Sequence, residues 1–121
     1  MTRTPYMTPC RPGDVDLVYF PFTSLRARKK RPAVVVSCLA FAARHGDAIV
    51  AALTSVDQVD DESALDDWKI AGLVKPTWIK PLVATLDVGL MERRVGKLSA
   101  RDCRKVAGAL HAAIAAEFLD R

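Results

Sequence analysis

Two strand-like runs joined by a strongly basic loop constrain the fold of this chain more than any other feature. The first run covers residues 15–20 and the second covers residues 33–37, while five of the six residues from 26 to 31 are Lys or Arg. Pro32 fixes its own φ and biases the residue before it toward extended geometry, so Arg31 has a defined direction where the second run begins. The pattern predicts a sheet edge with a cationic loop suited to a polyanion.

The rest of the chain predicts more short strands and one closing helix. We expect strands at residues 48–55, 78–80, 82–86 and 95–98, and a helix from about residue 100 to residue 119. Ser99 and Asp102 form a capping-box-like start to that helix. An apolar stripe follows at helical spacing, made of Cys103, Val106, Ala107, Leu110, Ile114 and Phe118. The predicted fold is mainly β with a C-terminal helix (α+β), a small curved barrel of five to seven strands.

Domain organisation follows from length and local composition. At 121 residues the chain is long enough for one core and too short for two. Residues 1–12 contain three prolines and little periodicity, so we expect a flexible arm there and a single domain over residues 13–121. Residues 57–67 carry six carboxylates and predict a solvated excursion from the core.

Charge and cysteine content narrow the function classes without choosing one. The net charge of +4 permits nucleic-acid binding and equally fits a soluble protein with surplus Lys and Arg. Cys38 and Cys103 read as small core residues and, with Cys10, form no CxxC-type metal pair. We therefore expect no metal, no cofactor and no disulfide framework. Apolar runs are too short for a membrane span and no signal-peptide pattern opens the chain, so we expect a cytoplasmic protein.

The order of these segments resembles the MazF/PemK family of toxin endoribonucleases. The resemblance is carried by Gly13-Asp14-Val15, by Tyr19-Phe20-Pro21-Phe22, by the basic loop and by residues 31–37, and it extends to residues 71–73, 75–76, 85–87 and 96–99. It implies a toxin of a type II toxin–antitoxin system with an SH3-like or CcdB-like barrel. The implied activity is metal-independent cleavage of single-stranded RNA, as an mRNA interferase. A ribose 2′-hydroxyl would attack the phosphorus and leave 2′,3′-cyclic phosphate and 5′-hydroxyl ends.

Two residues are the catalytic candidates under this resemblance. Arg31 matches the principal catalytic arginine, and a guanidinium offers a permanently charged, planar set of donors for phosphate oxygens. Thr54 matches the catalytic Thr or Ser that faces the arginine from the end of a strand. From the residues alone, Arg31 could instead end a solvated loop, and Thr54 could be a β-branched residue that ends a strand.

Six further positions are expected to contact RNA: Asp14, Phe22, Lys29, Lys30, Ser55 and Lys80. Asp14 could also be a turn residue, and Phe22 could be part of the core. Many relatives carry an acidic residue shortly after the position of Lys80, whereas this chain continues with Pro81 and Leu82. The identity of the general base therefore stays open.

The resemblance also implies partners and leaves two alternative functions. The partners are a second copy in a homodimer and a cognate antitoxin with an acidic tail, whose complex with the toxin binds DNA. One alternative is a CcdB-like gyrase poison, which acts through a Trp-Gly-Ile-type end of the closing helix; this chain ends Glu117-Phe118-Leu119-Asp120-Arg121. The other is a nucleic-acid-binding barrel without catalysis.

Overall fold

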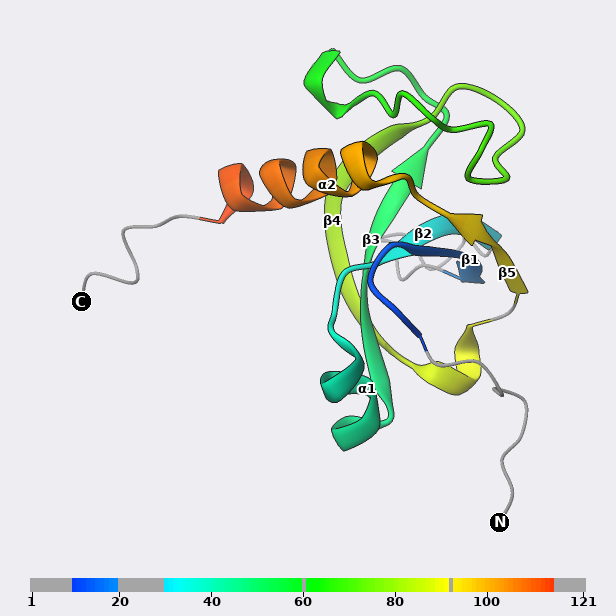
Figure 1. The fold of residues 1–121 in the computed structure, drawn as a ribbon, viewed down its shortest axis with the longest axis vertical. Coiled ribbons are helices and arrows are strands. Elements are labelled where there is room, and N and C mark those ends of the chain that lie inside the picture. Colours follow the sequence, from blue (N-terminus) through cyan, green and yellow to red (C-terminus); the bar gives the residue numbers. More distant parts are fainter. Residues whose placement is uncertain (1–9, 20–29, 60, 92, 115–121) are drawn as a thin grey trace, which may run out of the picture.

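A curved antiparallel sheet organises the part of the chain that the computed structural model describes, which is residues 10–19, 30–59, 61–91 and 93–114 (Figure 1). Its strands are β1 (Asp14–Tyr19), β2 (Lys30–Val35), β3 (Asp47–Thr54), β4 (Trp78–Asp87) and β5 (Arg93–Lys97). Their order across the sheet is β4-β3-β2-β1-β5. Within the described residues β4 and β5 do not pair, so the sheet curves without closing. The predicted fold, mainly β with a C-terminal helix, is confirmed.

The helical elements are α1 (Leu39–His45), α2 (Ala100–Ala113) and two short 3₁₀ turns, η1 (Asp61–Ser63) and η2 (Val88–Leu90). α2 begins beside β3 and β4 and points away from the sheet toward its C-terminal end (Figure 1). The Ser99 hydroxyl accepts a hydrogen bond from the Asp102 N–H at 3.3 Å, which confirms the predicted helix start. Of the predicted helix, residues 115–119 lie outside the described residues.

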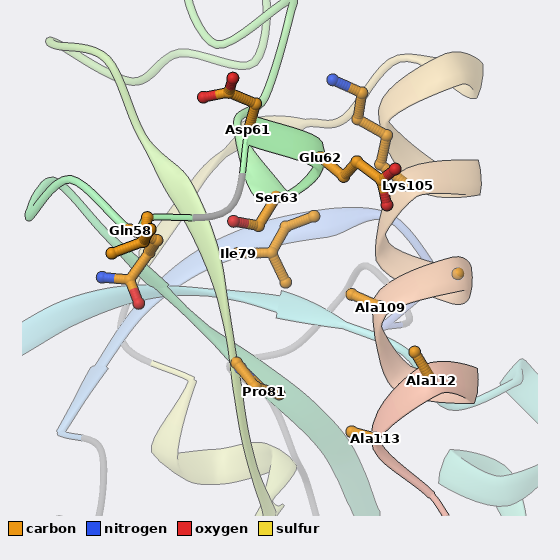
Figure 2. Close-up of a pocket in the computed structure, with 12 residues that line it drawn as sticks. Gln58, Asp61, Glu62, Ser63, Ile79, Pro81, Lys105, Ala109, Ala112 and Ala113 are labelled. Atoms are coloured by element: carbon orange, nitrogen blue, oxygen red, sulfur yellow. The ribbon is translucent and has the colours of Figure 1, made fainter.

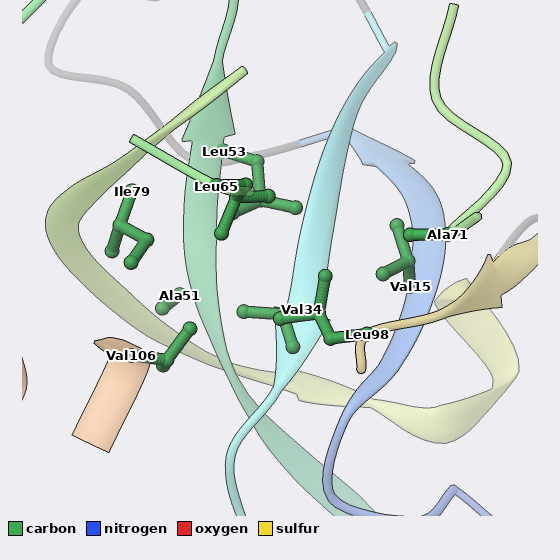
Figure 3. Close-up of a cluster of buried hydrophobic side chains, with 9 residues drawn as sticks. All are labelled: Val15, Val34, Ala51, Leu53, Leu65, Ala71, Ile79, Leu98 and Val106. Carbon is green, nitrogen blue, oxygen red and sulfur yellow. The ribbon is translucent and has the colours of Figure 1, made fainter. Parts of the chain in front are cut away.

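Two apolar clusters lie on opposite faces of the sheet, because successive strand residues point to alternate sides. We call the side packed by α2 the helix face; its buried cluster is Val15, Val34, Ala51, Leu53, Leu65, Ala71, Ile79, Leu98 and Val106 (Figure 3). The opposite face holds Cys10, Val18, Ala33, Val35, Ala48, Val50, Ala52 and Met91. Each strand residue can therefore be assigned to a face from its neighbours two positions away.

β4 is one strand of ten residues, so the prediction of two separate strands was wrong. Its register against β3 shifts beside Lys80: Lys80 pairs with Ala52, but Val83 pairs with Ala51. The two residues between them, Pro81 and Leu82, bulge out of the ladder. A proline cannot donate to a ladder, and it is tolerated here because β4 is an edge strand.

The short helix α1 was not predicted. It ends at Gly46, whose φ of 71° lies in the left-handed region and whose N–H donates to the Ala42 carbonyl at 2.8 Å. None of its residues is fully buried. A helix of seven residues without a buried stripe gives little periodic signal. Cys38, just before it, is exposed, which corrects its assignment to the core.

The acidic excursion is less solvated than predicted. Leu65 is buried in the helix-face cluster, and the backbone N–H groups of Asp66 and Asp67 donate to the fully buried Asp102 carboxylate at 2.9 and 2.8 Å. Arg101 also holds the Asp67 carboxylate through two hydrogen bonds of 2.8 Å, which lower the pKa of Asp67 strongly. These contacts fix the excursion to the first turn of α2.

Candidate functional site

The ends of three strands meet at one side of the sheet, because β2, β3 and β4 are antiparallel neighbours. We call this row of strand ends the edge, as distinct from the edge strand β4. β2 starts at Lys30, β3 ends at Thr54 and β4 starts at Trp78. The paired residues of β2 and β3 end at Ala33 and Ala52. Continued by two residues, that register aligns Arg31 with Thr54. The structure therefore brings the two predicted catalytic residues to the same edge.

Arg31 and Thr54 also lie on the same face of the sheet. Arg31 pairs with Val18 of β1, and Thr54 is two residues beyond Ala52 on β3; Val18 and Ala52 both belong to the cluster opposite the helix face. We call this side of the sheet the Arg31 face. Arg31 is exposed. The Thr54 hydroxyl accepts a hydrogen bond from the Val56 N–H at 3.1 Å, so its own proton can still be donated to a phosphate oxygen.

Lys80 lies on the same face of the sheet as Arg31 and Thr54, whereas Lys30 does not. Lys80 is exposed and stands opposite Ala52, which places it on the Arg31 face. Lys30 precedes Arg31 by one residue and so points to the helix face. Its ammonium lies 5.7 Å from the centre of the Tyr19 ring. Ser55 is exposed in the turn that follows Thr54.

Asp14 lies apart from this edge and already has two partners. It is four residues before Val18 on β1, which corresponds to roughly 13 Å along the strand. Its buried carboxylate forms an ion pair with Arg94 of β5 and accepts a hydrogen bond from the Arg11 N–H at 2.9 Å. These contacts give Asp14 a structural role at the other end of β1.

Asp16 is a buried carboxylate that the sequence analysis did not single out. It pairs with Ala33 and Arg94 on the two neighbouring strands, is 1% exposed, and its Oδ1 has no hydrogen-bond partner in the described structure. Burial raises the pKa of Asp16, nearby Arg94 lowers it and the Asp14 carboxylate raises it further. An acidic residue at an inward-facing strand position was the signal available in the sequence.

The raised pKa of Asp16 predicts a pH-dependent stability. The folded state holds the proton more tightly than the unfolded state, so this contribution is complete below the ordinary Asp pKa and is lost as pH rises through the raised value. We expect Asp16→Asn to remove this dependence and to be more stable than the parent at pH 7 by on the order of 1 kcal/mol. Urea unfolding between pH 3 and pH 8 measures it, with the exposed Asp57→Asn as the control. Parallel stability curves for parent and Asp16→Asn would contradict the prediction.

Several predicted features lie outside the described residues. They are Phe22, Lys29, most of the basic loop, and residues 117–121, on which the comparison with gyrase poisons depended. In the described ranges, His, Cys, Asp and Glu side chains do not gather in a group of three that could hold a metal ion. The described helices are also too short or too polar to cross a membrane.

A groove in the described structure lies elsewhere. It has a volume of about 930 Å³ and lies on the helix face between α2 and residues 58–59 and 61–63 (Figure 2). Small apolar residues of α2 form one wall, among them Ala109, Ala112 and Ala113. None of the six predicted site residues that the structure describes lines it. Among the described residues, exposed Arg31 and Lys80 and the hydroxyl of Thr54 gather instead at the strand ends of the Arg31 face.

Comparison with known proteins agrees with the fold. Residues 11–114 match the family described as PemK-like, MazF-like toxin of type II toxin–antitoxin system. No curated protein matches the chain. Among solved structures, Mycobacterium tuberculosis toxin MazF-mt6 is 19% identical with a TM-score of 0.67, covering 85% of this chain and 95% of that one. MazF from Deinococcus radiodurans is 20% identical with a TM-score of 0.68, covering 87% and 94%.

A third solved structure contains a partner. It is an endoribonuclease from a mycobacterial species in complex with its cognate antitoxin, 20% identical to this chain with a TM-score of 0.67, and it covers 88% of this chain and 94% of that one. At such identities these structures establish the shared fold.

Proposed function

Because the chain belongs to the PemK-like, MazF-like toxin family of type II toxin–antitoxin systems, we propose that it is an endoribonuclease that cuts single-stranded RNA. One observation carries this proposal: Arg31 and Thr54 lie at the same edge and on the same face of the sheet. A charged guanidinium beside a hydroxyl donor suits a phosphodiester whose oxygens gain negative charge during reaction. Exposed Lys80 on that face adds a further cation for the RNA backbone.

The proposed reaction is an internal transesterification. The 2′-hydroxyl of one ribose loses its proton to a base and attacks the adjacent phosphorus. The bond from phosphorus to the 5′-oxygen of the next nucleotide breaks, and that oxygen takes up a proton. The products are a 2′,3′-cyclic phosphate and a 5′-hydroxyl. Arg31 would stabilise the charge that develops on the non-bridging oxygens, and Thr54 would orient one of them.

Cleavage in excess EDTA tests the proposal. We expect purified protein to cut a long single-stranded RNA into discrete fragments with cyclic-phosphate ends, with and without EDTA. DNA of the same sequence should stay intact, because it lacks the nucleophile. An RNA in which the nucleotide before the cut carries a 2′-deoxy sugar should be cut everywhere except at that position. Intact RNA in the presence of folded protein would refute the nuclease and favour a binding module.

We also infer two protein partners. Deinococcus radiodurans MazF has been solved together with MazE, and the mycobacterial endoribonuclease with its antitoxin. The net charge of +4 and the exposed Arg31 and Lys80 suit an acidic antitoxin tail. We expect a cytoplasmic homodimer that the antitoxin inhibits by covering this edge, and that binds DNA only within the toxin–antitoxin complex. Sedimentation of the toxin alone and with the antitoxin checks the two assemblies.

A further inference from the structure

Trp78 is the residue directly opposite Thr54. The two residues pair across β3 and β4, so they lie on the same face with their Cβ atoms about 5 Å apart. Lys80, two residues further along β4, is on that face as well. On the Arg31 face, Trp78 is therefore a direct neighbour of both Thr54 and Lys80.

Among the described residues, the side chain of Trp78 belongs to neither apolar cluster. It is half-buried, yet it is not among the described side chains that form the two clusters or pack against them. The other tryptophan, Trp68, does pack against the helix-face cluster. A tryptophan carries a large apolar surface that is normally used for packing. Trp78 instead lies opposite Thr54 on the Arg31 face.

The backbone at Trp78 is fixed from several sides. Besides its pair with Thr54, Trp78 forms an isolated bridge with Ala64. The preceding residue, Thr77, is buried and its carbonyl accepts a hydrogen bond from the Leu65 N–H at 2.9 Å. A residue on so constrained a backbone loses little backbone entropy when a ligand binds to its side chain.

These observations point to a ligand with a flat apolar face next to a phosphate. Single-stranded RNA supplies both, since its unpaired bases stack on aromatic side chains while cations hold the backbone. We propose that Trp78 stacks on the nucleobase beside the scissile phosphate and thereby helps to select the cleavage site. This inference rests on the proposed function, because it requires RNA to cross the edge at Arg31.

Fluorescence reports the stacking independently of cleavage. The chain contains two tryptophans, so Trp68→Phe leaves Trp78 as the sole indole reporter. Titration of Trp68→Phe with fully 2′-O-methylated RNA, which cannot be cut, should quench the Trp78 emission. Unchanged emission at RNA concentrations that saturate binding, followed by a labelled RNA, would overturn the inference.

Cleavage kinetics give the second readout. A base–aromatic stack contributes about 1–3 kcal/mol, so Trp78→Ala should raise KM by roughly 5- to 150-fold and broaden the set of bases found next to the cut. Trp78→Phe keeps a ring and should recover most of the affinity and selectivity. Unchanged KM and cut-site distribution in folded Trp78→Ala would also overturn the inference. If Trp78→Ala does not fold, the emission of the intact Trp78 and the kinetics of Trp78→Phe decide.

Base stacking by Trp78 and RNA cleavage can be refuted independently of each other. Cleavage with cyclic-phosphate ends but no quenching of Trp78 leaves the nuclease intact and refutes the stacking. Quenching by methylated RNA, with no cleavage of ordinary RNA, supports the stacking and refutes the nuclease.

Discussion

Arg31→Ala is expected to lower the rate of RNA cleavage at saturating RNA by about a hundredfold to a thousandfold. Pro32 and the pairing of Arg31 with Val18 fix the backbone from which the guanidinium extends, which limits where it can lie before charge develops on the phosphate. Removing a preorganised donor of this kind commonly costs two to three orders of magnitude in kcat. Because the interaction strengthens in the transition state, we expect kcat to fall more than KM rises.

Two further variants, Arg31→Lys and Arg44→Ala, test whether cleavage depends on the guanidinium of Arg31 and not on net charge. Lysine keeps the charge but loses the planar fork of donors, so it should recover only part of the rate. Arg44 is an exposed arginine in the last turn of α1, and its removal lowers the net charge by the same amount. Arg44→Ala should cleave like the parent. Single-turnover assays of all three variants measure the chemical step. Equal losses in Arg31→Ala and Arg44→Ala would mean that net charge, and not the position of Arg31, governs cleavage.

The sequence predicted that the two candidate catalytic residues come together because the relevant signals are local. The Arg-Pro step lies where one apolar run begins, and Thr54 lies where another ends. In an antiparallel sheet, the start of one strand and the end of its neighbour meet at the same edge. The resemblance supplied the expectation that these two residues face each other. The structure places both on the Arg31 face.

What the sequence could not predict depends on pairing between distant segments. Asp14 was expected near the site, but its partner Arg94 lies 80 residues later and was not identifiable from local pattern. Lys30 points to the other face because a strand alternates, and this requires knowing that β2 already begins at Lys30. Trp78 became relevant only through its register with Thr54. Local patterns thus predict elements, whereas register determines which side chains meet.

Gly96→Ala is expected to destabilise the fold by about 3 kcal/mol, which corresponds to a fall in Tm of about 10 °C for a domain of this size. A Cβ on Gly96 would lie 2.1 Å from the Ala71 carbonyl oxygen and 2.8 Å from its carbon. Both clashing atoms belong to backbone, so no side chain can rotate away. Gly72 is equally confined: its φ is +89°, and a Cβ there would lie 2.5 Å from the Val95 carbonyl oxygen. The strand β5 and residues 71–72 therefore touch backbone to backbone.

Gly108→Ala provides the matched control, because the same methyl group there meets no atom within 4 Å. Gly108 lies inside α2, where alanine is favoured over glycine by about 0.8–1 kcal/mol, so this variant should be slightly more stable than the parent. Thermal and urea unfolding of both variants give the two shifts, with opposite signs expected. A Gly96→Ala protein within 0.5 kcal/mol of the parent would show that residues 71–72 can move off β5 at little cost.

Because Gly96 pairs with Val15 of the helix-face cluster, the loss should reach the core and lower global stability. Cleavage by the Gly96→Ala protein that remains folded should be nearly normal, since Arg31 and Thr54 lie on other strands of the sheet.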